Sequence, residues 1–494
     1  VGEPNAGYSD LDHAGYAAFS ADSASNNGYT RRTPMVYVGA NDGTLHGFNA
    51  CIAGVTPGCT VADEGKELIA YIPSMVYANL SRLTDKDYNA SHRYFVDGSP
   101  MVADANTGTT ALPVWKSVLV GSLNAGGQGY FALDVTNPTD TTKTAPTFAP
   151  ANAASLLLWE FSSADDADMG YTHNLPPTDR STGQASQIVK MQNGQWAVIV
   201  GNGYNSIGGK AVLYVLFIKA GEDGVWTPGT DYIRLPADDV GLGNGLSTPR
   251  PFDSDGDGLA DVIYAGDLKG NLWKFDVSDV VPANWGVALG GAPLFAAGAT
   301  KPVTSPPVID LHPKGGNLVM FGTGKYLETG DTTNTSGQTM YGIWDNNDGS
   351  VAAGELVQQI QTAGVPSTGT QNPVNYSTLV KGWYTNLPGS GERLVAIPAV
   401  KDGILTFTSI SPSISPCDFG GKGKVYRLDY LTGAMLSFPA FDTNGHGVVD
   451  ANDALSAATE IGFSPGGVTH LEGVDSDLLA SSKADGTLVK TPTA

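Results

Sequence analysis

Six segments of this 494-residue chain repeat one pattern, and the repetition limits the possible folds more than any other feature. Each segment begins with a short apolar run rich in β-branched residues, continues through glycine with small or polar residues, and ends in a second short strand pattern. A run such as Val262–Ala265 is apolar on both faces, which is typical of a strand covered on both sides. The segments are Val36–Ala50, Ser117–Asn137, Ala197–Leu216, Asp261–Ser278, Leu318–Asp345 and Ile404–Tyr430.

One hairpin cannot bury both of its faces, whereas a ring of small sheets can. The segments start further apart than the roughly 40–45 residues of a bare propeller blade, which indicates long insertions. We therefore predict an all-β chain that forms a modified, irregular seven-bladed β-propeller, with a further blade in Arg93–Ala105. A pair of β-sandwiches is the alternative fold.

The predicted domain is single and covers residues 1–494, with a core at about residues 32–435 and residues 436–494 as a C-terminal extension. We expect the chain to be a fragment of a longer protein. Pro73–Asp85 fits a short amphipathic helix because proline begins it and apolar residues recur along it. A second helix is expected within Asn346–Pro373, around the sequence GELVQQIQTAG.

The charge of the chain excludes some partners. Its formal net charge is −22 and its isoelectric point is near 4.5, which argues against nucleic acid and against simple electrostatic docking on anionic lipid. No apolar run approaches the roughly 18 residues that cross a bilayer, so direct membrane insertion is not expected.

The three cysteines indicate an oxidising compartment. Cys51 and Cys59 bracket a short loop with proline and glycine, which favours a disulfide, although two unpaired thiols are the alternative. Cys417 is left over, either free or paired outside this chain.

A dense acidic loop precedes the strand pattern at Val262. With Asp253 as position 1, side chains of Asp255, Asp257 and Asp261 fall at positions 3, 5 and 9 of an EF-hand calcium loop, with a glycine at position 6. The backbone carbonyl of Leu259 falls at position 7. Hard oxygen donors of this kind select Ca²⁺, but position 12 is not glutamate and no flanking helix is expected, so Asp261 would close the site.

A second candidate calcium loop lies at Phe441–Leu455. Its ligand positions resemble those of dockerin-type calcium loops, and the residues after it fit an exiting helix, but the histidine at position 5 is a poor Ca²⁺ ligand. A third acidic stretch, Asp345–Ser350, is better explained as a turn. The candidate ligands of the second loop are Asp442, Asn444, His446, Val448, Asp450 and Asp453.

No arrangement of residues points to catalysis. The histidines are scattered, His46 lies in a strand pattern and is expected to be a packed residue, and no nucleophile elbow, zinc-protease helix or phosphate loop is present. Quinone-dependent dehydrogenases are also propellers with tryptophan-bearing repeats, but this chain lacks their adjacent cysteine pair. The tryptophans expected to pack within or beside the strands are Trp115, Trp159, Trp196, Trp273 and Trp344.

Several motifs, in the same order, resemble the C-terminal domain of the type IV pilus tip-associated biogenesis and adhesin proteins, the PilY/PilC family. The resemblance runs from about Arg32 to Tyr430. The motifs are VYVGANDGTLHGFNA, KELIAYIPSMVYANL, RYFVDGSPMVADA, GGQGYFALDVTN and DVIYAGDLKGNLWKFDVS.

The resemblance implies a modified seven-bladed propeller that binds one Ca²⁺ in an EF-hand-like loop, onto which Asp253–Asp261 falls. It also implies that calcium occupancy regulates pilus extension and retraction, and with them twitching motility, surface sensing and attachment. The implied partners are minor pilins and host-cell or surface receptors, and the implied location is the pilus tip or cell surface after export. A quinone-dependent dehydrogenase and a secreted calcium-stabilised glycan-binding propeller are the alternatives.

Overall fold

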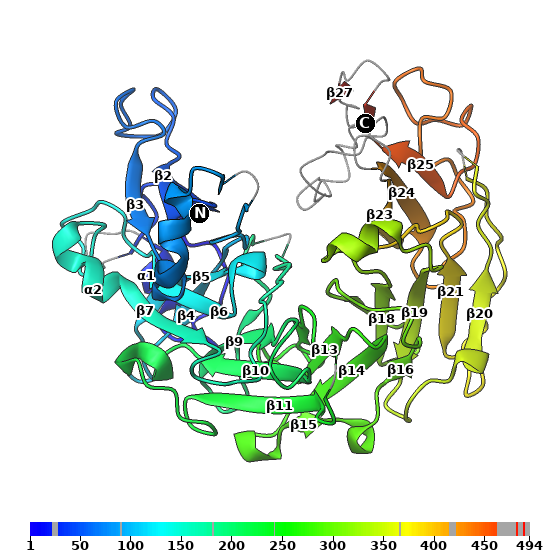
Figure 1. Ribbon diagram of the computed structural model, residues 1–494, viewed down its shortest axis with the longest axis horizontal. Coiled ribbons are helices and arrows are strands. Elements are labelled where there is room, and N and C mark those ends of the chain that lie inside the picture. Colours follow the sequence, from blue (N-terminus) through cyan, green and yellow to red (C-terminus); the bar gives the residue numbers. More distant parts are fainter. Residues whose placement is uncertain are drawn as a thin grey trace. The chain divides into compact units, whose positions relative to one another are not determined.

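The computed structural model describes residues 1–21, 28–88, 91–179, 182–241, 243–364, 367–413 and 421–461, and the two short strands at 481–482 and 488–489. Its helices and strands are labelled in Figure 1. The chain divides into two compact units. The first unit comprises Val1–Ile263 and Asp276–Gly286; the second comprises Tyr264–Phe275 and the described residues from Val287 onward.

Three antiparallel sheets lie within the first unit, and in each the strands follow one another in chain order. This arrangement needs only short connections between neighbours. The strands of the three sheets are β1 (Met35–Gly39), β2 (Leu45–Asn49) and β3 (Glu67–Tyr71); β4 (Met101–Asn106), β5 (Trp115–Ser122), β6 (Gly129–Asp134) and β7 (Leu157–Ser162); and β8 (Ile188–Lys190), β9 (Trp196–Gly201), β10 (Ala211–Phe217) and β11 (Tyr232–Asp238).

A fourth sheet contains the points where the chain passes from one unit to the other. Two further sheets and a short strand pair follow it in the sequence. The strands of the fourth sheet are β12 (Arg250–Phe252), β13 (Val262–Gly266), β14 (Asn271–Asp276), β15 (Gly286–Val287) and β16 (Phe295–Ala296); the next sheet has β17 (Val308–Leu311), β18 (Asn317–Gly322), β19 (Thr339–Asp345), β20 (Leu356–Gln359) and β21 (Gly382–Asn386); the last has β22 (Ala399–Lys401), β23 (Ile404–Pro412), β24 (Gly421–Asp429) and β25 (Ala458–Ile461), and the pair is β26 (Ser481–Ser482) with β27 (Leu488–Val489).

The helices of the described residues are short and mostly of the 3₁₀ type. None of them is long and apolar enough to cross a bilayer. They are α1 (Tyr16–Ser20), α2 (Ala153–Leu156), η1 (Ser74–Thr84), η3 (Asn124–Gly126), η4 (Pro150–Asn152), η5 (Ala220–Asp223), η6 (Pro282–Asn284), η7 (Leu289–Gly291), η8 (Thr329–Thr333) and η9 (Ala353–Glu355).

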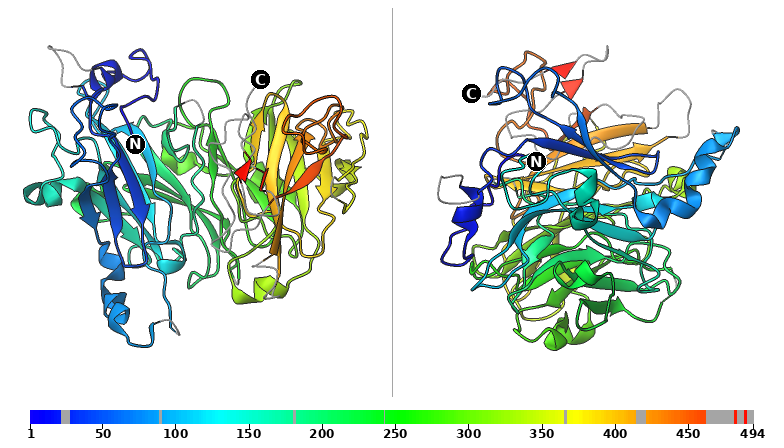
Figure 2. Two further views of the ribbon diagram at one scale, coloured as in Figure 1. Left: turned by 90° about the horizontal axis from the view of Figure 1, so that it is seen from above. Right: turned by 90° about the vertical axis from the view of Figure 1, so that its left-hand side faces the viewer.

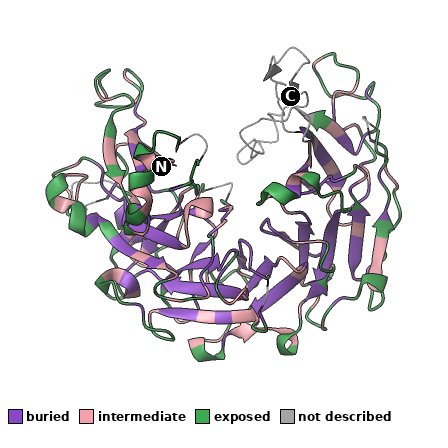
Figure 3. Cartoon of the chain, viewed as in Figure 1, coloured by how far each residue is buried: buried purple, intermediate pink, exposed green. Residues whose placement is uncertain are grey.

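The six predicted hairpins are all present, as β1–β2, β5–β6, β9–β10, β13–β14, β18–β19 and β23–β24. Every residue of β9, β10, β18 and β19 is buried, as expected for strands covered on both faces (Figure 3). The described strands form six sheets of three to five strands, most of them in sequential strand order, rather than the four sheets that a pair of β-sandwiches would have, so that alternative is wrong.

The prediction of a separate blade in Arg93–Ala105 is wrong. This segment supplies β4, whose residues Met101–Asn106 pair in register with β5 and complete the sheet that follows. The described residues form six sheets of three or more strands, so the count of seven blades stays a prediction.

One helix prediction is confirmed and another is wrong. The helix expected at Pro73–Asp85 is η1, which buries Val76 and lies outside the sheets of the first unit (Figure 2). The helix expected near Leu356 is instead β20, which runs parallel to β21. The buried side chain of Gln359 donates to Thr432 O at 3.0 Å and accepts from Thr370 Oγ1 at 2.8 Å, so side-chain hydrogen bonds favour the extended form.

Two other side-chain expectations have different outcomes. The five tryptophans are all buried, which confirms the packing prediction. His46 is not a packed core residue; its ring nitrogens lie 2.5 Å from Glu67 Oε1 and 2.9 Å from Asp42 Oδ2. Hydrogen bonding to Glu67, and then to Asp42, raises the pKa of His46. The alternating strand placed this histidine on the polar face of its sheet.

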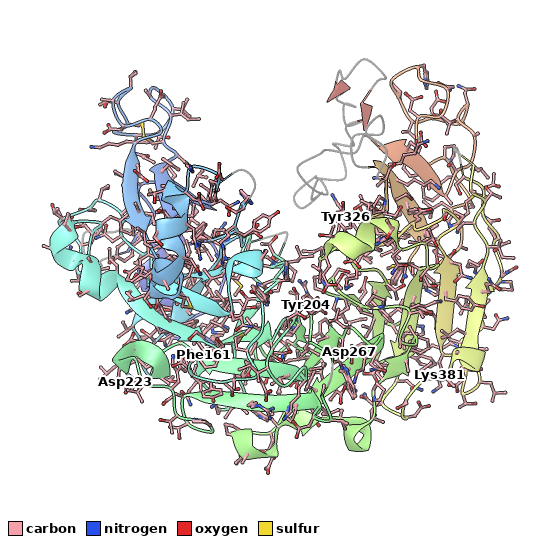
Figure 4. The ribbon with its side chains drawn as sticks, viewed as in Figure 1. Phe161, Tyr204, Asp223, Asp267, Tyr326 and Lys381 are labelled. Carbon is pink, nitrogen blue, oxygen red and sulfur yellow. A yellow bond between two sulfur atoms is a disulfide. The ribbon has the colours of Figure 1, made fainter. Side chains whose placement is uncertain are left out.

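Hydrogen bonds and ion pairs of buried aspartates stabilise two of the connections between strands. Between β13 and β14 the buried Asp267 accepts hydrogen bonds from Asn271 N and Nδ2 and from Trp273 Nε1, at 2.8–2.9 Å (Figure 4). The acidic stretch Asp345–Ser350 begins at the last residue of β19 and then bends at Asn347–Asp348, in agreement with the expectation that it changes the chain direction. Its Asp345 pairs with Lys274 at 2.7 Å, and its Asp348 pairs with Lys381.

Aromatic side chains join the second and third sheets of the first unit. Phe161 of β7 is fully buried and packs edge-on against Trp226, Tyr232 and Tyr214, with ring centroids 4.9–5.5 Å apart (Figure 4). Edge-to-face pairs stabilise by more than the area that they bury.

Replacing Phe161 with alanine should lower the free energy of unfolding by about 3–5 kcal/mol, because it opens a cavity among fixed rings. Leu157→Ala, at an exposed position of the same strand, should change it by no more than about 0.5 kcal/mol. Denaturant unfolding followed by tryptophan fluorescence measures both. Equal losses of unfolding free energy in the two variants would show that the aromatic cluster does not stabilise the fold more than an exposed leucine does.

His173 should make stability depend on acid pH. Burial lowers the pKa of His173 from 6.5 to about 4, so between these values the unfolded chain binds a proton that the folded chain does not. Stability therefore falls as pH drops from 6.5 towards 4, by at most about 3 kcal/mol. His173→Gln should remove this part of the acid sensitivity. Parallel stability curves for both proteins from pH 7 to pH 4 would contradict it.

Candidate metal centre

The acidic loop joins two neighbouring strands of the fourth sheet. It begins after Phe252, the last residue of β12, and ends where β13 begins at Val262. The loop ends are held by the sheet, because Asp261 N donates to Phe252 O at 3.1 Å and Val277 N donates to Asp261 O at 2.9 Å. The carboxylates therefore project from a loop whose two ends are fixed.

Within the loop, each aspartate accepts backbone N–H groups. Asp253 accepts Gly256 N and Gly258 N, both at 2.7 Å, one on each carboxylate oxygen. Both glycines have positive φ, 82° and 84°, which glycine adopts without the usual steric cost. Asp261 accepts Ser254 N at 2.7 Å and so closes the loop onto its own start.

Three of the four predicted carboxylate ligands come together and the fourth does not. Oxygen atoms of Asp253, Asp255 and Asp261 all lie within 4.8 Å of one another. Asp257 is outside this group; its Oδ1 accepts Leu259 N at 2.8 Å. Leu259 is itself half-buried beside the start of β13.

The turn between β8 and β9 supports the closing aspartate from outside the loop. Gln192 Nε2 donates to Asp261 Oδ1 at 2.9 Å, and Ala260 N donates to Lys190 O at 3.0 Å. Burial, and then repulsion from the three other aspartates of the loop, raises the pKa of Asp261. The charged form of this side chain is thus costly unless a cation lies nearby.

His13 of the N-terminal segment also contacts the loop. A Cβ atom added at Gly258 would lie 3.2 Å from His13 Nε2, so this glycine permits a close approach. Sequence reasoning missed both Gln192 and His13. No local signal identifies them, because they are distant in sequence and only the packing of the unit brings them to the loop.

The second acidic loop has the same start. Asp442 accepts Gly445 N and Gly447 N, both at 2.7 Å, which reproduces the two hydrogen bonds of Asp253. The buried Asp453 accepts Thr443 N at 2.7 Å, the role that Asp261 has in the first loop. Thus two stretches of sequence adopt one local conformation with different closing residues.

The ligand positions of the second loop are only partly brought together. Asp442, His446 and Asp453 lie within 4.8 Å of one another, whereas Asp450 is outside that group and Val448 is exposed. His446 lies 3.3 Å from Asp450 Oδ2 and 3.4 Å from Asp442 Oδ1. Hydrogen bonds to Asp450, and then to Asp442, raise the pKa of His446. Asn444 Oδ1 accepts His446 N at 3.1 Å.

The helix expected after the second loop is wrong. Residues 454–457 have no helical turn, and the chain then forms β25 (Ala458–Ile461), which pairs with β24 as an edge strand. The loop therefore lacks the exiting helix of dockerin-type sites, because its following residues complete a sheet instead.

The predicted disulfide is present. Cys51 and Cys59 are joined in a disulfide, with Cα atoms 6.0 Å apart, in the loop between β2 and β3. Cys417 lies outside the described residues.

The chemistry of the first loop suits a hard divalent cation. Its side chains offer oxygen atoms alone, three carboxylates converge, and neither cysteine nor histidine is among the predicted ligands. Ca²⁺ takes six to eight oxygen ligands, including carboxylates and backbone carbonyls. Asp257 and the carbonyl of Leu259 are the nearest further donors in the sequence pattern.

Substitutions at the two glycines test how the loop packs. Gly256→Ala should cost about 1 kcal/mol because its φ is positive and its Cβ meets nothing. Gly258→Ala should cost more, because its Cβ also presses on His13. In a His13→Ala background the two costs should become equal, as measured by unfolding in a double-mutant cycle. A difference that survives in that background would contradict the contact.

The chain matches a family model described as the PilY1 beta-propeller domain over residues 10–371. It is 36% identical over 476 residues to the type IV pilus biogenesis factor PilY1 of Pseudomonas aeruginosa, covering 86% of this chain and 37% of that protein. It is 37% identical over 428 residues to a PilY1 homolog of Xylella fastidiosa, covering 81% of this chain and 26% of that protein. The chain thus spans about a third of the length of these curated relatives.

The chain is also similar to a solved structure of this family. The crystal structure of the Pseudomonas aeruginosa PilY1 C-terminal domain matches with a TM-score of 0.70 and 31% identity, covering 99% of this chain and 96% of that chain. The two curated relatives are named as pilus biogenesis factors rather than enzymes, which is against the dehydrogenase alternative.

Proposed function

The chain belongs to the family of the PilY1 β-propeller domain, and from this premise we propose that it serves type IV pilus biogenesis as a calcium-binding domain at the pilus tip. Ca²⁺ in the Asp253–Asp261 loop regulates pilus extension and retraction, and through them twitching motility and surface attachment. Minor pilins are its partners in the pilus, and surface or host-cell receptors are its partners in adhesion. The domain acts after export, at the cell surface.

The convergence of Asp253, Asp255 and Asp261 carries this proposal. Three carboxylates whose oxygens lie within 4.8 Å repel one another in water. A divalent cation among them turns that repulsion into attraction. When bound, Ca²⁺ supplies this neutralisation, with Asp257 and the carbonyl of Leu259 as the further ligands.

The contacts around the loop indicate how Ca²⁺ binding would affect neighbouring segments of the first unit. Asp261 accepts a hydrogen bond from Gln192 of the β8–β9 turn, and His13 of the N-terminal segment lies close to Gly258. A loop that is fixed by a cation fixes these two neighbours as well. Local ordering of this kind changes a surface without changing the fold.

Calorimetric titration of the calcium-free chain tests the site. We expect saturable Ca²⁺ binding that is weakened at least about tenfold, or 1.4 kcal/mol, by Asp255→Asn, since one charged ligand is lost. Asp257→Asn should weaken it too if the loop closes around the ion. Asp87→Asn changes the net charge equally at an exposed position elsewhere and should leave binding unchanged. Equal binding by the Asp255→Asn protein and the parent would contradict the site.

The regulatory role needs a test in the bacterium that carries the gene. A chromosomal Asp253→Asn variant should reduce the twitching zone while the protein keeps its fold and abundance and pili are still made. The Asp87→Asn strain should twitch normally. Normal twitching in a strain whose protein no longer binds Ca²⁺ would refute the regulatory role and leave the binding site intact.

The second loop is proposed as a weaker calcium site with Asp442, Asn444, His446, Val448, Asp450 and Asp453 as its ligands. Its start matches that of the first loop, but the imidazole between Asp442 and Asp450 occupies the position of an oxygen ligand. Asp442→Asn should therefore remove only a second, weaker binding event in the same titration. A single event that this variant leaves unchanged would reduce the second loop to a turn.

A further inference from the structure

A cavity of about 270 Å³ lies within the first unit, beside the metal loop but not lined by its carboxylates. Three segments line it: the N-terminal segment at Asp12–Ala14, the β4–β5 connection at Asn106 and Gly108–Thr110, and the β8–β9 turn at Lys190 and Asn193–Trp196. Its volume lies just below the roughly 300–1,000 Å³ of typical small-molecule pockets. This is room for one small ring with substituents rather than for an extended chain.

The walls of the cavity are held in place before any ligand arrives. Asn106 Oδ1 accepts Gly108 N and Val114 N at 2.8 and 2.9 Å, and Asn193 Oδ1 accepts Gln195 N at 3.1 Å. Lys190 Nζ donates to Asp12 O at 3.0 Å and ties the N-terminal segment to the turn. Preformed walls reduce the entropy cost of binding.

The polar groups of the lining include donors and acceptors without a net charge. The carboxylate of Asp12 and the ammonium of Lys190 balance each other, and the other polar side chains are amides, hydroxyls and the imidazole of His13. In the described part of the chain, Asn106 and Asn193 use their Oδ1 atoms for the hydrogen bonds above, which leaves both Nδ2 groups to a ligand. A ligand here must both donate and accept several hydrogen bonds, and a charged ligand gains nothing over a neutral one.

Two ring side chains form the apolar part of the lining. Trp196 borders the cavity, and its ring centroid lies 5.8 Å from that of the imidazole of His13. His13 is 8% exposed, and its Nδ1 has no hydrogen-bond partner in the described part of the chain. Burial, and then the charge of Lys190, lowers the pKa of His13, so the ring is neutral at pH 7. Buried polar atoms without partners are uncommon and often mark a site for a ligand or water.

We propose that this cavity binds a single neutral sugar unit. A pyranose presents hydroxyl groups that each donate and accept, as the amides and hydroxyls of the lining require. Its C–H face is apolar and suits the part of Trp196 that borders the cavity, since the rest of that ring is covered by Tyr8, His13 and Trp115. The balanced charge is against an ionic ligand, and the number of amide and hydroxyl groups is against a purely apolar one. None of the loop carboxylates lines the cavity, but His13 lies beside both the cavity and Gly258, so the variants below are chosen at residues other than His13.

The experiment uses the 494-residue chain and saturation-transfer NMR with D-glucose, D-galactose, D-mannose and N-acetyl-D-glucosamine. N-acetylneuraminic acid and glucosamine serve as charged comparators. We expect at least one neutral sugar to bind saturably, with a Kd in the millimolar range, on the order of −4 kcal/mol. Two variants avoid residues that touch the metal loop: Gln195→Ala removes an amide of the lining, and Thr110→Phe fills the cavity from an exposed position.

Both variants should weaken sugar binding at least tenfold, while Gln358→Ala, at an exposed position outside the cavity, should leave it unchanged. In a chain labelled with 5-fluorotryptophan, the ¹⁹F resonance assigned to Trp196 should shift with the sugar. The proposal is overturned if no neutral sugar binds up to about 50 mM, if only a charged comparator binds, or if binding persists in Thr110→Phe. Ca²⁺ titration of the same variants should be unchanged, which separates this test from that of the metal loop.

Discussion

A small antiparallel sheet with apolar residues on both faces cannot remain alone in water, and the whole fold depends on this constraint. β9 and β10 are buried at every position, so each face needs a neighbouring layer. Aromatic rings such as Phe161 and Trp226 fill the space between the sheets of the first unit. Polar function is then confined to the connections at the strand ends, where the acidic loops, the disulfide and the cavity are found.

The metal loop illustrates how such a connection is built. Four aspartates lie within nine residues of this loop, and their negative charges repel one another. Each carboxylate nevertheless accepts a backbone N–H that a tight turn would otherwise leave unpaired. The hydrogen bonds direct the loop into shape, and the repulsion that remains among Asp253, Asp255 and Asp261 is relieved by the proposed cation. The second loop repeats the start of this design with a histidine where an oxygen ligand is expected.

The sequence predicts the features that depend on local patterns. The hairpins follow from apolar runs and glycine turns, and the loop of Asp253 follows from the spacing of its aspartates. Prediction from the sequence fails where contacts between residues distant in the chain determine the local structure. β20 has a helical composition, but the buried amide of Gln359 is bonded across the chain. Gln192, His13 and the cavity beside them have no signal in the sequence near the loop. The segment after Asp453 becomes an edge strand because β24 offers it a partner.

Family membership and the geometry of the loop both support the central proposal, that Asp253–Asp261 binds a calcium ion. Anomalous diffraction from crystals of this chain grown with CaCl₂, measured at long wavelength, tests that claim most directly. We predict an anomalous peak among the carboxylates of Asp253, Asp255 and Asp261, with oxygen distances of about 2.3–2.6 Å. A loop with no peak at saturating calcium, or with the carboxylates occupied by water alone, would contradict it.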